Sequence, residues 1–63
     1  MNTKTKLAMS ELVNAAVALA EDESIPLLQR LDLLRAAWSM CAKVHSVGNA
    51  TYLAGLISSL TGR

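Results

Sequence analysis

The chain has 63 residues, of which 52% are hydrophobic, and its formal net charge is +1. This length excludes more than one domain, and a balanced charge does not favour a nucleic-acid or acidic partner. A domain of this size buries only about 60% of the surface of its unfolded chain. Disulfides, metals or association with another chain usually stabilise such small proteins. The single cysteine, Cys41, cannot form a disulfide within the chain.

The apolar residues are mostly leucine and alanine, which favour helices. The first helix is expected over about residues 5–20, because its apolar side chains recur at helical spacing. That predicted face comprises Met9, Leu12, Val13, Ala16, Val17, Leu19 and Ala20. The acidic linker Glu21–Glu23 follows, then Ser24 as the expected N-cap of a second helix with Pro26 in its first turn. A linker this short predicts that the first two helices are antiparallel neighbours.

The second helix is expected over about residues 26–46 and has two apolar stripes. The first stripe comprises Leu27, Leu31, Leu34, Trp38, Cys41 and His45, and the second comprises Leu33, Ala37, Met40 and Val44. A helix at the edge of a globule needs only one stripe, so two stripes predict that another chain completes the core. Arg30 falls within the apolar arc. The acidic linker is its expected partner, and an anchor in a protein interface is the alternative.

The third helix is expected over about residues 50–61, with Gly48 ending the second helix in a left-handed conformation and Asn49 as the cap. Its predicted apolar stripe comprises Tyr52, Leu53, Leu56, Ile57 and Leu60. The opposite face is small and uncharged, which fits either a weakly polar exposed surface or the core of a dimer. The predicted fold class is all-α: an antiparallel helical hairpin plus a short third helix, one domain over residues 1–63, forming an intermolecular helical bundle.

Candidate chemistry is sparse in this chain. Cys41 and His45 lie one turn apart, and two copies across a two-fold axis would offer four zinc ligands. A buried thiol beside a helix-terminal histidine is the preferred interpretation, because the usual CxxC spacing is absent. No acid lies at helical spacing from His45, and no glycine-rich phosphate loop is present. We therefore expect a non-enzyme that binds neither a metal nor a cofactor.

The longest uncharged run, Val44 to Gly62, approaches a membrane span in length. It contains several serine, threonine, asparagine and glycine residues, and its apolar residues are periodic, so we expect no transmembrane helix. The first residues do not form a clean signal-peptide core, because Glu11 and Asn14 interrupt the apolar stretch. These features predict a cytoplasmic protein.

The chain is short, and Lys4, Lys6 and Leu7 precede its first amphipathic helix. In these two features it resembles the Rop family of plasmid RNA-binding bundles. That resemblance implies a dimer that binds RNA. Such binding needs a basic and aromatic face, and the first helix offers only Lys4 and Lys6. The third helix has no lysine or arginine for a DNA groove. A nucleic-acid-binding regulator, of RNA or DNA, is therefore the alternative function.

The short length, the helices rich in alanine and leucine and the lack of an active-site motif resemble small helical accessory proteins of lambdoid phages. Those proteins are encoded between the exonuclease and excisionase genes. The resemblance implies a protein of the bacterial host cytoplasm that modulates a host or phage protein. We expect a homodimeric, non-catalytic protein–protein interaction module. The candidate interface residues are Arg30, Leu34, Arg35, Trp38, Cys41, Tyr52, Leu56 and Leu60.

Overall fold

The structure, a computed structural model, describes residues 2–62 and contains the helices α1 (Thr3–Glu21), α2 (Leu27–Lys43) and α3 (Val47–Thr61). No strand occurs within residues 2–62, so the all-α class is confirmed. Compared with the sequence-based boundaries, α1 and α3 begin earlier and α2 ends earlier. Asn2 caps α1, because its side chain accepts a hydrogen bond of 2.8 Å from the Thr5 N–H.

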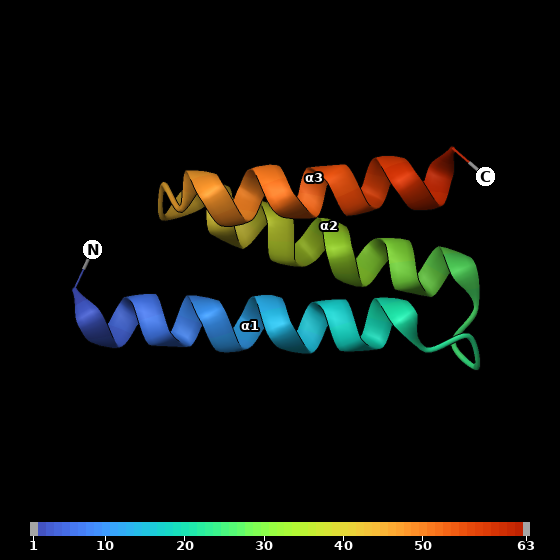
Figure 1. Cartoon of the computed structure of the whole chain (residues 1–63), viewed down its shortest axis with the longest axis horizontal. Helices are drawn as coiled ribbons and strands as arrows, with labels where there is room; N and C mark the ends of the chain where they lie inside the picture. The colour runs from blue at the N-terminus through green and yellow to red at the C-terminus, as the bar shows by residue number, and fades with distance from the viewer. Residues whose placement is uncertain (1, 63) are drawn as a thin grey trace.

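The helix α2 lies between the other two and packs against both of them (Figure 1). Successive helices run in opposite directions, so α1 and α3 flank α2 and point the same way. The molecule measures 36 × 19 × 13 Å. In the view down the shortest axis, α2 lies partly behind α3 (Figure 1). The helices therefore do not lie in a single layer, and side chains of all three contribute to one core.

The core lies along α2, where the two flanking helices meet it. Its buried side chains are Met9, Val13, Ala16, Ala20, Leu31, Leu34, Ala37, Cys41 and Leu53. The buried positions of α1 follow the spacing of four and three residues expected for one helix face. Within residues 2–62, the completely buried side chains of the core are Leu34, Leu53 and Cys41, and three other core positions are alanine. This core accordingly holds few large side chains, although the chain contains many.

The linker between α1 and α2 differs from the expectation for Ser24. The Ser24 N–H and Oγ both donate to Asp22 Oδ1, at 2.9 and 2.6 Å. The first residue of α2 is Leu27, preceded by Pro26 at the cap position without a side-chain hydrogen bond. The prediction that Ser24 caps α2 is therefore wrong, because its hydroxyl group is engaged by Asp22. These hydrogen bonds from Ser24 hold the pKa of Asp22 below its usual value.

The turn between α2 and α3 also departs from the prediction. His45, not Gly48, adopts the left-handed conformation, with φ of 58°. The Ser46 N–H donates to the Cys41 carbonyl at 2.8 Å and the His45 N–H donates to the Ala42 carbonyl at 3.1 Å. This pair of bonds is a Schellman motif, and histidine tolerates the left-handed region better than the β-branched Val44 before it.

The start of α3 follows from the early end of α2. Ser46 occupies the cap position of α3, and Gly48 lies within the first helical turn. The Asn49 side chain donates to Ser46 Oγ at 2.9 Å. The predicted roles of Gly48 as the end of α2 and of Asn49 as the cap of α3 are therefore wrong.

Candidate functional site

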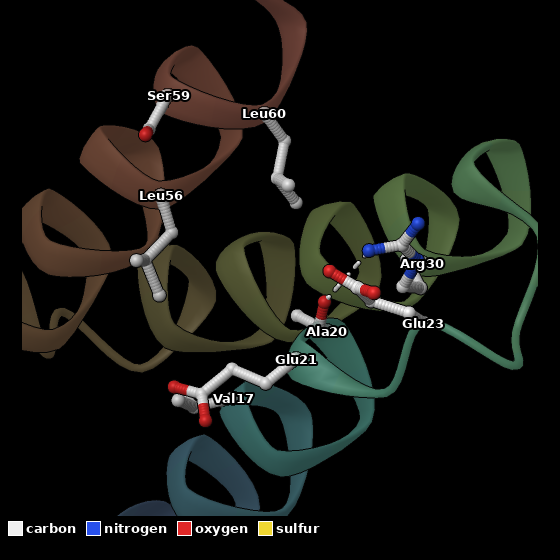
Figure 2. Close-up of a pocket in the computed structure, with 8 residues that line it drawn as sticks. All are labelled: Val17, Ala20, Glu21, Glu23, Arg30, Leu56, Ser59 and Leu60. Carbon is white, nitrogen blue, oxygen red and sulfur yellow. Dashed lines mark hydrogen bonds between the residues drawn. The ribbon is translucent and has the colours of Figure 1, made fainter. Parts of the chain in front are cut away.

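A groove of about 300 Å³ lies between α1 and α3, near the linker that joins α1 to α2. Its lining residues are Val17, Ala20, Glu21, Glu23, Arg30, Leu56, Ser59 and Leu60 (Figure 2). Leu56 and Leu60 come from α3 and Val17 from α1, so the two flanking helices form apolar walls. Arg30 and Glu23 lie at the polar linker end, whereas the Glu21 side chain extends beside Val17 (Figure 2). The groove therefore combines apolar walls with charged side chains at the linker end and along α1.

Arg30 is fixed by the backbone at this polar end. Its Nε donates to the Ile25 carbonyl at 2.9 Å. Its Nη1 donates to the Ala20 carbonyl at 3.3 Å, and Figure 2 shows this second bond. Ala20 lies in the last turn of α1, where the helix dipole favours a positive charge. The expected ion pair between Arg30 and the acidic side chains of Glu21–Glu23 is not formed within residues 2–62. Arg30 is held instead by the two backbone carbonyl groups that flank this linker. Within residues 2–62, the ion pair present is between Arg35 and Asp32, at 3.9 Å.

A second concave surface lies on the other side of α2, where it meets α3. We call it the Trp38 hollow; it has a volume of about 340 Å³ and is lined by Arg35, Trp38, Ser39, Ala54 and Ile57. Trp38 is 43% exposed, so it does not belong to the buried core. Arg35 is the charged side chain of this lining. An exposed tryptophan beside an arginine is typical of the energetic centre of a protein interface.

A third apolar surface covers the side of α1 and α2 that faces away from α3. On α1, Val17 points to the groove shared with α3, and Leu12 and Leu19 lie on the opposite side of the helix at 100° per residue. On α2, Trp38 marks the side that meets α3, and Met40 lies on the far side. We call this surface the α1–α2 face; it comprises Ala8, Leu12, Ala15, Leu19, Leu33, Ala36, Met40 and Val44.

The α1–α2 face contains no charged residue, and most of its larger side chains are exposed, although Leu12 is half-buried and packs against the core. Leu19 is 40% exposed, Leu33 is 38% exposed and Met40 is 48% exposed. Single exposed apolar residues are normal at a protein surface, but a contiguous patch of them marks an interaction site. This face is continuous because α1 and α2 pack against each other along it.

The candidate residues named from the sequence separate into distinct groups. Arg30, Leu56 and Leu60 come together in the groove, and Arg35 and Trp38 come together in the hollow. Tyr52 is 51% exposed on α3 and lines neither surface. Leu34 and Cys41 have no exposed surface, so we assign them to the core and remove them from the set that contacts a partner.

The sequence assigned Leu12 and Leu19 to the single apolar face predicted for the first helix and did not separate the α1 half of the α1–α2 face from it; Leu19 is in fact exposed. A usable signal was present, because Ala8, Leu12, Ala15 and Leu19 follow the spacing of four, three and four residues that also marks the buried face of α1. The two stripes of α1 overlap at the edge of the buried face. Periodicity alone therefore gave one broad apolar surface rather than two.

The suggested metal pair is not arranged as a site. Cys41 is completely buried, and burial raises the pKa of its thiol. His45 is exposed in the turn after α2. No group of three or more histidine, cysteine or acidic side chains suited to a metal occurs within the described part of the chain.

No helix within residues 2–62 is long and apolar enough to cross a membrane. Comparisons of the chain with models of protein families, with curated proteins and with solved structures gave no match.

Proposed function

We propose that this protein is a small, non-catalytic protein–protein interaction module that forms a homodimer and binds a further protein. One observation carries the proposal: large apolar side chains are left exposed on contiguous surfaces, while three of the nine buried core residues within residues 2–62 are alanine. Leu33, Trp38 and Met40 are each between 38% and 48% exposed. Surfaces of this kind are typical of sites where proteins associate.

The Trp38 hollow is the proposed site for the further protein. Tryptophan and arginine are enriched among residues whose truncation weakens binding most. Trp38 and Ile57 provide an apolar surface, and Arg35 lies at the rim, where it would meet a carboxylate of the partner. The partner expected for this site is therefore a segment with an apolar anchor next to an acidic residue. The proposed biological role is that of a phage-type accessory protein in the bacterial cytoplasm, which modulates a host or phage protein by stoichiometric binding.

Affinity capture from a bacterial lysate, with matched variants of the immobilised protein, tests this role. Trp38→Gln removes the centre of the hollow, and Leu28→Gln removes an apolar side chain on α2 that is 74% exposed and lines neither the hollow nor the groove. We expect one captured protein to bind wild type and Leu28→Gln equally and to be lost with Trp38→Gln. Equal capture by all three would contradict the assignment of the hollow.

The same experiment addresses the alternative of a nucleic-acid-binding regulator. Phosphate contacts produce a steep loss of affinity as the salt concentration rises, whereas apolar contacts do not. We expect capture to survive nuclease treatment and moderate salt. Capture that disappears under both conditions would favour the nucleic-acid function over the proposed one.

A further inference from the structure

We propose that the α1–α2 face is occupied by a second copy of this chain, docked so that α1 of each copy lies on α2 of the other. This inference rests on the proposed function, because it names the surface through which the homodimer forms. The two copies would be related by a two-fold axis parallel to the helices. Since α1 and α2 run in opposite directions (Figure 1), every pair of neighbouring helices in this four-helix core is then antiparallel.

The register between α1 and α2 makes the two halves of the face match across this axis. The hydrogen bond of 3.3 Å between Arg30 and the Ala20 carbonyl brings the levels of these two residues together, to within the reach of the arginine side chain. Counting about 1.5 Å per residue away from that level along both helices places Leu33 near Leu19. The same count places Met40 near Leu12 and Val44 near Ala8, each within about one helical turn. A two-fold axis parallel to the helices preserves these levels. The α2 residue of each pair in one copy therefore lies near the α1 residue of the same pair in the other copy.

Charges at the rim of the face are complementary in the same arrangement. Glu11 borders the face on the outer side of α1, one turn from Ala8 and Ala15. Lys43 borders it on the outer side of α2, next to Met40. Both are exposed, and within residues 2–62 of one copy neither forms an ion pair. The two residues lie about one helical turn from the same level, so the two-fold axis places Glu11 of one copy opposite Lys43 of the other, twice per dimer.

Docking over the whole length of α2, beyond the residues of the face itself, would give an interface at the lower size limit of a specific dimer. The 17 residues of α2 correspond to a length of about 25 Å at 1.5 Å per residue. Two packed helices are about 20 Å wide, given interaxial distances of about 8–10 Å. Each copy would thus contribute about 500 Å², and the pair would reach the total of about 1,000 Å² that a specific interface requires.

This arrangement leaves the Trp38 hollows uncovered, because they lie on the side of α2 that meets α3. The dimer would present two such hollows, and a partner with two binding segments would bind it more tightly than one with a single segment. Dimerisation and partner binding are therefore expected to be separable by mutation.

Size-exclusion chromatography with light scattering, over a dilution series, tests the surface. Met40→Glu introduces a charge near the centre of the face, and Leu28→Glu introduces the same charge on another side of α2. We expect wild type and Leu28→Glu to be dimers and Met40→Glu to dissociate with a constant raised about tenfold or more, since an unpaired charge would be buried. Far-UV circular dichroism should show that all three remain helical.

A charge exchange at exposed positions provides a second test that does not depend on the core. Glu11→Lys and Lys43→Glu should each weaken the dimer a few-fold, and the variant carrying both should recover the affinity of wild type. A double variant weaker than either single variant would overturn the proposed two-fold arrangement.

The possible failures are distinguishable. A wild-type protein that is monomeric at every concentration would contradict the homodimer in the proposed function and this inference together. A wild-type dimer that Met40→Glu leaves unchanged would overturn only the assignment of the α1–α2 face. Wild-type dimers lost with Trp38→Gln but not with Met40→Glu would place the second copy on the Trp38 hollow instead.

Discussion

Replacing Arg30 by methionine tests how α1 is joined to α2. The substitution keeps the apolar stem and removes the two hydrogen bonds to the carbonyls of Ile25 and Ala20, at 2.9 and 3.3 Å. Hydrogen bonds to a charged group contribute about 1.5–3 kcal/mol when buried, and a cation at a helix C-terminus adds about 0.3–1 kcal/mol. Arg30 is half-buried, so water replaces part of this interaction. We expect a loss of about 2 kcal/mol in the free energy of unfolding.

A loss of this size is large for the molecule, because a core of about 60 residues rarely supplies more than about 3–5 kcal/mol. It should lower the melting temperature by about 8–16 °C, at about 4–8 °C per kcal/mol for a domain of this length. Thermal unfolding followed by circular dichroism, at equal protein concentrations, measures the change.

Arg35→Met is the matched control for this experiment. Arg35 is exposed and forms only a 3.9 Å ion pair with Asp32 one turn away. Such a pair contributes about 0.5 kcal/mol or less. We expect the control variant to unfold close to wild type. Equal melting temperatures for Arg30→Met and Arg35→Met would refute the reasoning that the carbonyl contacts of Arg30 stabilise the fold.

Further outcomes are expected for Cys41, His45, Gly48 and Asp22. Cys41→Ala should keep the fold and lose about 1–2 kcal/mol of stability, because it is a modest large-to-small change in the core. A chelator added to the wild-type protein should not change its melting curve. The Cys41 thiol should react with an alkylating reagent far more slowly in the native protein than in denaturant, because it is buried and its pKa is raised; equal rates would contradict its burial. His45→Gly should raise the free energy of unfolding by about 1 kcal/mol, because glycine adopts the left-handed backbone without strain. Gly48→Ala should raise it by about 0.5 kcal/mol, because Gly48 is helical and an added Cβ meets no atom within 4 Å. A destabilised Gly48→Ala variant would instead support Gly48 as the end of α2. The pKa of Asp22 is lower in the folded state than in the unfolded chain, so its carboxylate stabilises the fold above its unfolded-state pKa. This contribution is lost as the pH falls through the folded-state pKa. In an NMR titration, Ser24→Ala should raise the Asp22 pKa towards its usual value.

The helical class and the core of α1 could be predicted from the sequence, because one periodic stripe reports one buried face. Met9, Val13, Ala16 and Ala20 were all named as part of that face and are all buried. The second stripe of α2 was also visible, and Leu33 and Met40 are indeed uncovered in a single chain. Periodicity specifies that a face is apolar, but it does not specify which neighbour covers it.

The position of Trp38 shows that limit. The sequence placed it in one stripe with Leu34 and Cys41, yet Leu34 and Cys41 are fully buried and Trp38 is 43% exposed. On the helix circumference these residues differ by several tens of degrees. Whether such a difference leads to burial depends on where α3 crosses α2, which only tertiary packing determines.

The turn residues were the least predictable part. Gly48 has the residue type that usually ends a helix, but α2 ends earlier, with His45 in the left-handed conformation. Ser24 has the residue type that usually begins one, but its hydroxyl group donates to Asp22. Each case is a competition between local hydrogen-bonding solutions of similar free energy, and residue preferences alone do not decide between them.

The central claim is that two copies associate through the α1–α2 face with α1 of one copy on α2 of the other. Isotope-filtered NMR on a mixture of labelled and unlabelled chains detects contacts between copies only. We expect intermolecular signals between the Met40 methyl group and the methyl groups of Leu12, and between Leu33 and Leu19. Intermolecular signals from Trp38 or Tyr52 in place of these pairs would contradict the claim.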